Sequence, residues 1–194
     1  MSDKKNYIIA VCGGSASRKT TFVHLLSKEL GMKNVTCLSQ DDYYRDLSHL
    51  TMEERDQVNF DEPRSIDSEL LIKQFLQLSK GQSIERPCYD FSTHCRTEET
   101  CEVKPEKILI FEGTFSLAFK ELRSLYDLVL YLDVPSDIRF IRKLQRDLGS
   151  RGRKLTHVVD QYLNMVRVMH NKFVEPCKEH ADFVIPWTHQ SDKI

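Results

Sequence analysis

Short apolar runs alternate along the chain with segments in which apolar residues recur at helical spacing. The runs are rich in branched residues and too short for helices, so they predict buried strands. They cover Tyr7 to Cys12, Val35 to Leu38, Ile108 to Phe111, Leu128 to Leu132 and Phe183 to Ile185. The helical spacing predicts helices over Lys19 to Leu30, Asp67 to Lys80, Ser116 to Leu125, Ser136 to Leu148 and His157 to Val174.

Residues with strong boundary preferences flank these predicted helices. Glycine commonly follows the last helical residue, and we expect this role for Gly31, Gly81 and Gly149. For the last helix we expect Thr156 as the N-cap and Pro176 as the stop.

The alternation of strands and helices predicts an α/β fold. Strand–helix–strand units build a parallel sheet covered by helices on both faces, and ligands bind at the carboxyl ends of its strands. Ser83 to Val103 breaks the alternation, because two β-like ends flank a polar, aromatic middle. This segment predicts a hairpin that projects from the sheet. A length of 194 residues fits a single domain over residues 1–194.

Composition narrows the classes of function. Hydrophobic residues make up 40% and charged residues 29%, which argues against disorder. A net charge of -1 argues against a general affinity for nucleic acid or for an anionic membrane. We find no apolar leader and no run near the ~20 apolar residues that span a bilayer, so we expect a cytoplasmic protein. The six cysteines lack CxxC spacing and are expected to be reduced thiols.

The stretch CGGSASRKTT, Cys12 to Thr21, nearly matches the phosphate-binding loop pattern GxxxxGK[ST]. In that pattern backbone N–H groups surround the phosphates, the lysine reaches the β and γ groups, and the hydroxyl holds magnesium. Gly13, Lys19 and Thr20 fit, whereas Arg18 stands where the pattern has glycine. The apolar strand before the loop and the helix after it favour a phosphate site, because a helix N-terminus attracts anions.

The sequence leaves open what Arg18 does in this loop. A left-handed backbone costs a residue with a side chain roughly 1–2 kcal/mol. Its Cβ also takes space that glycine leaves to a phosphate. Arginine nevertheless keeps its backbone N–H and adds a cation that points either to solvent or to a phosphate.

Further stretches, read together with this loop, resemble the uridine-cytidine kinase family, P-loop enzymes that phosphorylate the 5′-hydroxyl of pyrimidine ribonucleosides. They are LSQDDYYRDL (38–47), NFDEP (59–63), PCYDFSTHCR (87–96), and RDLGSRGRKL (146–155) with QYLNMVRVMHNKFVEPCKEHADFVIP (161–186). The likeness runs in order over nearly the whole chain. It implies a P-loop NTPase-like parallel sheet flanked by helices, with a projecting hairpin at about 83–103 and a basic lid at about 149–154.

The resemblance implies phosphorylation of uridine or cytidine, with ATP or GTP as the phosphate donor and Mg²⁺ as the metal. Phosphoryl transfer depends on positioning and charge neutralisation. The implied catalytic residues are Asp41 as general base, Lys19 and Arg146. The implied metal site consists of Thr20, Asp41 and Glu112, the last at a strand end where an unpaired carboxylate is costly. Asp42 is expected to point away from Asp41, because side chains alternate in an extended segment.

The resemblance also implies two sets of ligand contacts. The nucleotide-binding residues would be Gly13, Gly14, Ser15, Ala16, Ser17, Arg18, Lys19, Thr20, Thr21, Arg151 and Arg153. The nucleoside-binding residues would be Tyr44, Phe60, Asp61, Tyr89, Phe91, His94, Arg96, Lys143, Arg146 and Gln161. Asp61 would accept from ribose hydroxyls, Tyr89 and Phe91 would enclose the base, and His94 would contact its polar edge.

Basic residues form a further group. Arg139, Lys143 and Arg146 recur at three- and four-residue spacing and so share one helix face. In the family this helix and the following loop form a lid whose arginines close over the phosphates of ATP. Lys143 stands where many relatives carry arginine, which removes the planar fork but keeps the charge.

The chain departs from the family again at its C-terminal end, IPWTHQSDKI, where relatives usually continue with a turn and another helix. In relatives that turn commonly lies near the adenine of ATP. Trp187 and Thr188 stand in its place here, so the adenine-binding part of the site is expected to differ from that of relatives. Self-association, which the family favours, would cover an exposed sheet face.

Three functions remain open: a nucleoside kinase, a catalytically impaired homologue that binds nucleoside or nucleotide, and a kinase for another small hydroxyl substrate such as a sugar phosphate. The aromatic YDFSTH hairpin favours a nucleoside. The sequence does not rank uridine against cytidine.

Overall fold

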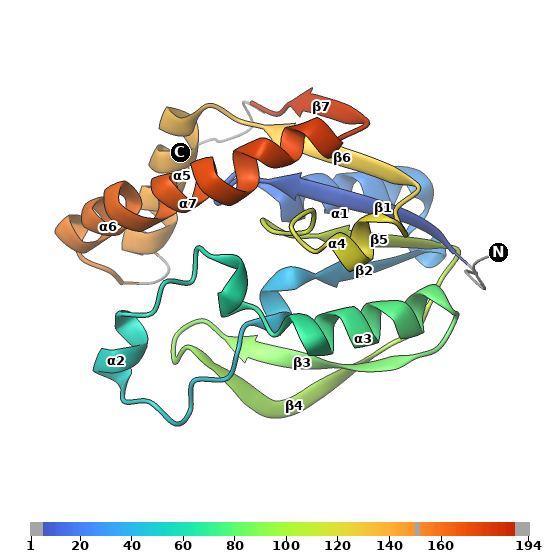
Figure 1. Cartoon of the computed structure of the whole chain (residues 1–194), viewed down its shortest axis with the longest axis horizontal. Coiled ribbons are helices and arrows are strands. Elements are labelled where there is room, and N and C mark those ends of the chain that lie inside the picture. The colour runs from blue at the N-terminus through green and yellow to red at the C-terminus, as the bar shows by residue number, and fades with distance from the viewer. Residues whose placement is uncertain (1–5, 150–151, 189–194) are drawn as a thin grey trace.

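The computed structural model describes residues 6–149 and 152–188. In this part of the chain a parallel sheet has the strand order β2-β5-β1-β6-β7 (Figure 1). Its strands are β1 (Tyr7–Gly13), β2 (Val35–Ser39), β5 (Ile108–Glu112), β6 (Leu128–Asp133) and β7 (Phe183–Pro186). The predicted strands and the predicted parallel sheet are confirmed.

The side chains of the central strand β1 alternate between two cores. Ile8, Ala10 and Cys12 belong to a core that includes Phe75 and other residues of α3 (Ser68–Ser79). Ile9 and Val11 belong to the other core, which is covered by α1 (Lys19–Leu30). Burial on both faces explains why the strand reads as a continuous apolar run. Figure 1 shows helices on both sides of the sheet, as predicted.

The helices α1, α3 and α5 (Ser136–Gly149) agree closely with their predicted ranges. The Asp67 side chain caps α3 by accepting from the backbone N–H of Leu70 at 3.1 Å. Gly31 and Gly81 follow their helices with φ of 83° and 78°, as predicted. Gly149 differs, because it is the last residue of α5 itself.

The predicted helix over Ser116 to Leu125 is largely wrong, since only α4 (Lys120–Arg123) is helical. Tertiary contacts decide this segment. The Tyr126 hydroxyl donates to the carbonyl of Ser116 at 2.7 Å. Alternate apolar side chains also turn into the core, which a helix would not allow: Phe115, Leu117 and Phe119.

The long C-terminal helix starts earlier than predicted. It consists of α6 (Leu155–Gln161), α7 (Arg167–Met169) and two wider, π-type turns at Tyr162–Val166 and His170–Val174. Lys154 is its N-cap, and Thr156, which was expected there, lies in the first turn. A 3₁₀ segment, Glu175–His180, follows and contains Pro176. None of the described helices has both the length and the apolar character needed to cross a membrane.

A second sheet lies apart from the parallel one in Figure 1 and forms the predicted hairpin. Its strands β3 (Ile84–Asp90) and β4 (Cys95–Val103) are antiparallel, with a shift in register between Pro87 and Tyr89. A short helix, α2 (Met52–Asp56), was not predicted, although a capping box of Thr51 and Glu54 marks its start.

The carboxyl ends of β1, β2 and β5 meet at one edge of the parallel sheet. Ser39 pairs with Glu112, and Glu112 also pairs with Val11. The loop after β1, the turn after β2 and the end of β5 therefore come together, where ligands bind in open α/β sheets.

Candidate active site

The loop between β1 and α1 turns sharply just before the helix. Ala16 and Arg18 have φ of 61° and 64°, in the left-handed region. The Arg18 side chain, at the N-cap position, does not bond the first N–H groups of α1. These groups and the positive end of the helix dipole form an environment that binds anions.

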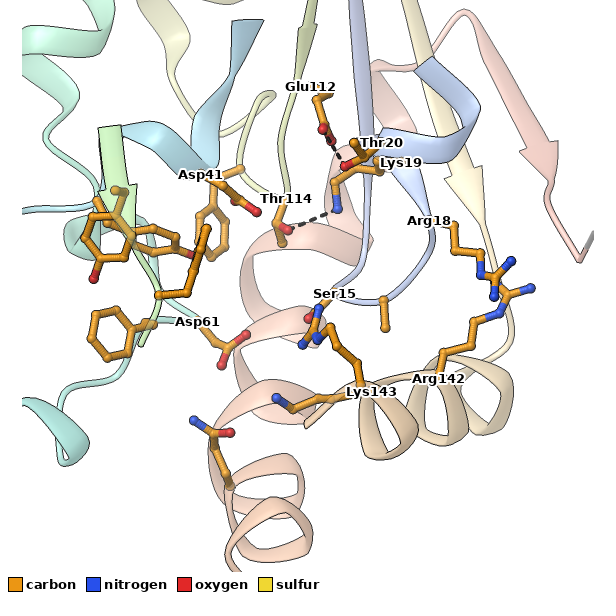
Figure 2. Close-up of a pocket in the computed structure, with 18 of the residues that line it drawn as sticks. Ser15, Arg18, Lys19, Thr20, Asp41, Asp61, Glu112, Thr114, Arg142 and Lys143 are labelled. Carbon is orange, nitrogen blue, oxygen red and sulfur yellow. Dashed lines mark hydrogen bonds between the residues drawn. The ribbon is translucent and has the colours of Figure 1, made fainter. Parts of the chain in front are cut away.

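Arg18 holds the left-handed backbone that glycine adopts without strain. The conformation costs roughly 1–2 kcal/mol, which the folded protein tolerates. In Figure 2 the Arg18 side chain points away from Lys19 and Asp41 and towards Arg142. Arginine at this position therefore preserves the turn and leaves open the space between Lys19 and Asp41.

Lys19 is held in the loop by three acceptors. Its ammonium donates to the carbonyl oxygens of Gly13 at 3.1 Å and Gly14 at 3.2 Å, and to the hydroxyl of Thr114 at 3.2 Å (Figure 2). The ammonium thus lies against the start of the loop and lines the pocket, where it would reach a phosphate bound by the loop.

Thr20 and Glu112 meet across the sheet edge. The Thr20 hydroxyl donates to Oε1 of Glu112 at 2.6 Å (Figure 2). Burial raises the pKa of Glu112, although the Lys19 ammonium and the Thr20 hydroxyl act in the opposite direction. A hydroxyl and a carboxylate this close, with Asp41 nearby in the same pocket, fit the oxygen ligands that Mg²⁺ prefers.

The other side of the loop packs against buried polar side chains. A Cβ on Gly14 would lie 2.6 Å from Nη1 of Arg139 and 3.0 Å from Nδ1 of His170, so a larger residue here would have to displace these buried side chains. Burial and the neighbouring Arg139 lower the pKa of His170 to about 4, which keeps its ring neutral at pH 7. The side chains behind the loop therefore support it sterically.

Asp41 and Asp42 point to different partners. Asp41 is exposed and lines the pocket, while Asp42 forms an ion pair with Arg86 of the hairpin. The expected divergence is observed, but the reason given for it was wrong. The segment Gln40–Tyr43 is a 3₁₀ turn and not an extended strand.

A pocket of about 550 Å³ brings together most of the predicted site residues. It is lined by predicted residues from the loop after β1, the turn after β2, the segment between α2 and α3, the end of β5, the hairpin, the helices and the lid segment: Ser15, Ala16, Arg18, Lys19, Thr20, Asp41, Tyr44, Phe60, Asp61, Tyr89, Phe91, His94, Glu112, Lys143, Arg146, Arg153 and Gln161. Three predicted loop residues, Gly13, Gly14 and Ser17, are buried and outside this lining, and Thr21 is exposed on α1.

Aromatic rings form the side of the pocket opposite the loop. Tyr89 lies between Tyr44 and Phe91, with ring centroids 5.2 Å from each. The rings of Phe60 and His94 stack at 4.5 Å. A wall of this kind suits a flat, partly polar ligand.

Arg96 is the predicted nucleoside contact that lies outside the pocket lining. Its guanidinium donates to the carbonyl of Tyr44 at 3.0 Å and to Asp67 at 3.1 Å. These bonds tie β4 to the segment after β2, so we assign Arg96 a structural position behind the aromatic wall.

The cations of α5 are organised by Asp147, which is completely buried. Asp147 accepts from Lys143 at 2.6 Å and from Arg146 at 2.9 Å. Burial would raise the pKa of Asp147, but the two cations outweigh it and hold the pKa below its usual value. Burial likewise raises the pKa of Asp61, and Lys143 and Arg146 oppose the shift. Asp147 thus holds both cations facing Asp61.

Sequence reasoning missed several residues of this site. Thr114, Phe115, Arg142 and Gln145 also line the pocket, and Asp147 lies directly behind it. Arg139, grouped in the sequence with Lys143 and Arg146, instead donates to the carbonyl of Val134 at 3.0 Å. The spacing of Arg142 and Arg146 was the available signal for Arg142, since residues four apart share a helix face.

Arg153 connects the lid segment to the rest of the pocket. It contacts Gln161 at 3.3 Å and His94 of the hairpin at 3.3 Å. Arg151 and part of the predicted lid lie outside the described residues.

Comparisons with known proteins agree with this geometry. The chain is 45% identical over 179 residues to a uridine kinase from Staphylococcus haemolyticus, covering 92% of this chain and 86% of that protein. It is 43% identical over 183 residues to a uridine kinase from Staphylococcus aureus, covering 94% and 88%. The fold is similar to phosphoribulokinase from Rhodobacter spheroides, with a TM-score of 0.70 at 16% identity over 94% of this chain and 70% of that one.

The model of the phosphoribulokinase/uridine kinase family matches residues 8–193, nearly the whole chain. This match confirms the resemblance on which the sequence analysis relied. With the relatives above, it establishes that the chain belongs to the phosphoribulokinase/uridine kinase family.

Proposed function

We propose that this protein transfers the terminal phosphate of ATP to the 5′-hydroxyl of uridine or cytidine. The main support for this function is that Asp41 shares one pocket with Lys19 on the loop side and with Tyr89 on the hairpin side. A proton acceptor for an alcohol thus lies between a phosphate site and a site for a flat ring. Relatives named uridine kinase at 43–45% identity support the same function.

The hairpin side would hold the nucleoside. Tyr89 and Phe91 would stack against the pyrimidine, and His94 would hydrogen-bond its polar edge. Asp61 would accept from the ribose hydroxyls and so direct the 5′-carbon towards Asp41. A sugar phosphate gains little from an aromatic wall, so the wall favours the nucleoside over that alternative.

The loop side would hold the triphosphate. Asp41 would take the proton of the 5′-hydroxyl as its oxygen attacks the terminal phosphorus. Lys19, Lys143 and Arg146 would neutralise the charge of the transferring group. Thr20, Glu112 and Asp41 would hold Mg²⁺, whose chemistry is to neutralise phosphate oxygens.

The proposal predicts a narrow range of acceptors. In an assay of ADP release, we expect turnover with uridine and cytidine, and only background turnover with purine nucleosides or with sugar phosphates. We expect the space between the aromatic wall and the loop to fit a pyrimidine and to exclude the larger purine ring. Binding of uridine without ADP release would instead favour the impaired homologue, for which Arg18 is the specific observation.

Arg18→Gly should raise ATP affinity or rate. Glycine holds the φ of 64° without strain and removes the Cβ beside the phosphates. Relief of the strain, roughly 1–2 kcal/mol, stabilises the free and the ATP-bound protein alike. The gain in kcat/KM for ATP comes from the space that the missing Cβ leaves to a phosphate, and we expect it to reach about tenfold, or about 1.4 kcal/mol. Steady-state kinetics at varied ATP measure it.

Arg18→Ala is the matched control, because it removes the cation and keeps the Cβ. We expect no gain from it. If Arg18→Gly lowers both ATP affinity and rate, arginine is not an impediment in this loop.

A further inference from the structure

The hairpin brings two thiols together away from the phosphate loop. The Sγ atoms of Cys88 and Cys101 lie 3.3 Å apart. Arg86 pairs with Cys101 across the strands, and Cys88 stands two residues beyond Arg86. The contacts of Cys101 with both Arg86 and Cys88 bring the three side chains together on the hairpin.

This pair is accessible, unlike the other adjacent cysteines. Cys101 is exposed and Cys88 partly exposed, whereas Cys12 and Cys177, which also contact each other, are both buried. A disulfide needs an S–S distance of about 2 Å, so the two sulfurs must approach by roughly 1 Å. The register shifts between Pro87 and Tyr89, so the ladder does not hold Cys88 opposite a partner residue on β4.

The same face of the hairpin adjoins the active site through Arg86. Its guanidinium lies beside the Cys101 thiol and forms an ion pair with Asp42, the neighbour of Asp41. On the same strand as Arg86, Cys88 directly precedes Tyr89, whose ring belongs to the aromatic wall. Movement of the Cys101 sulfur would therefore shift Arg86 and its partner Asp42, next to Asp41. Movement of the Cys88 sulfur would shift Tyr89 in the aromatic wall.

We propose that Cys88 and Cys101 form an oxidisable dithiol whose closure to a disulfide weakens nucleoside binding. The oxidant is a small disulfide such as glutathione disulfide. One protein thiolate attacks a glutathione sulfur, forming a mixed disulfide and releasing one glutathione. The second protein thiolate attacks the protein sulfur of the mixed disulfide and releases the other glutathione. The two protein thiols lose two electrons, and their protons pass to the released glutathiones.

Closure opposes binding because it draws Cys88 towards β4, and Tyr89 with it. The aromatic wall then departs from the arrangement that encloses the pyrimidine. We expect the Kd for uridine to rise about fivefold, the lower end of usual coupling between sites. By linkage, bound uridine should make the disulfide harder to form by the same factor. The effect on uridine rests on the proposed function.

The test oxidises the whole chain with glutathione disulfide. Peptide mass spectrometry maps the linkage, and calorimetry measures uridine binding before oxidation, after it, and after reduction by dithiothreitol. We expect a Cys88–Cys101 link and a Kd rise that reduction reverses. Cys88→Ser and Cys101→Ser should each abolish the rise, whereas Cys37→Ser and Cys95→Ser, which keep the pair, should retain it.

Two results would overturn the proposal. In the first, no Cys88–Cys101 disulfide forms, because the thiols stay free or each carries glutathione. In the second, the disulfide forms but the Kd for uridine does not change. Failure of the proposed function looks different. In that case the reduced protein neither binds nor phosphorylates uridine, while the peptide map still decides whether the dithiol closes.

Discussion

Asp41→Asn is expected to lower kcat for uridine phosphorylation by about 100- to 10,000-fold, the usual contribution of a general base. The amide keeps the size of the carboxylate but cannot take the proton from the 5′-hydroxyl. Asp41 is exposed in the pocket, and its backbone N–H donates to the hydroxyl of Ser39 at 3.3 Å, a bond that asparagine keeps, so the substitution should not disturb the fold. Steady-state kinetics measure kcat, and calorimetry should show that uridine still binds.

Asp42→Asn is the matched control for this prediction. It makes the same chemical change one residue away, at a carboxylate that faces Arg86 instead of the pocket. We expect little change in kcat. Equal losses of kcat from the two variants would contradict the assignment of Asp41 as the proton acceptor.

Asp147→Ala is expected to destabilise the protein by about 3–5 kcal/mol, because it leaves the buried Lys143 ammonium without its carboxylate. The side chains of Lys143 and Asp147 are 5% and 0% exposed, so bulk solvent screens the uncompensated charge only weakly. Urea unfolding followed by circular dichroism measures the loss. Asp137→Ala, at an exposed position on the same helix, should cost less than about 1 kcal/mol.

A second variant separates the ion pair from the packing. Lys143→Met combined with Asp147→Leu removes both charges, and we expect it to recover much of the stability lost in Asp147→Ala. Its kcat should stay low, because a cation of the pocket is gone. A double variant as unstable as Asp147→Ala would show that shape, and not unpaired charge, dominates at this site.

Much of the fold could be predicted because the strongest signals are local. The runs Tyr7 to Cys12 and Ile108 to Phe111 are apolar on both faces, as strands covered on both sides must be. Asp67 and Gly31 act at helix ends through bonds and conformations that involve only neighbouring residues. Ser116 to Leu125 failed because contacts with distant residues override its helical spacing.

The candidate site was predicted largely by resemblance, and the limits of that reasoning are visible in its arginines. Arg96 matched the family by type and spacing, and Arg139 shared the helix spacing of Lys143 and Arg146, yet one bonds Asp67 and the other lies behind Gly14. Arg142 was overlooked and lines the pocket. Spacing assigns a helix face but not the partner on that face, which comes from another part of the chain.

By itself the sequence determined the strands of the parallel sheet, the helices α1, α3 and α5, and the position of the loop before Lys19, because these depend on residues close together in the chain. Only the tertiary structure decided that the Arg18 side chain leaves the loop open, that Asp147 holds two cations, and that Cys88 lies against Cys101. Such features depend on the packing of side chains from separate elements, and a one-dimensional pattern carries neither their distances nor their directions.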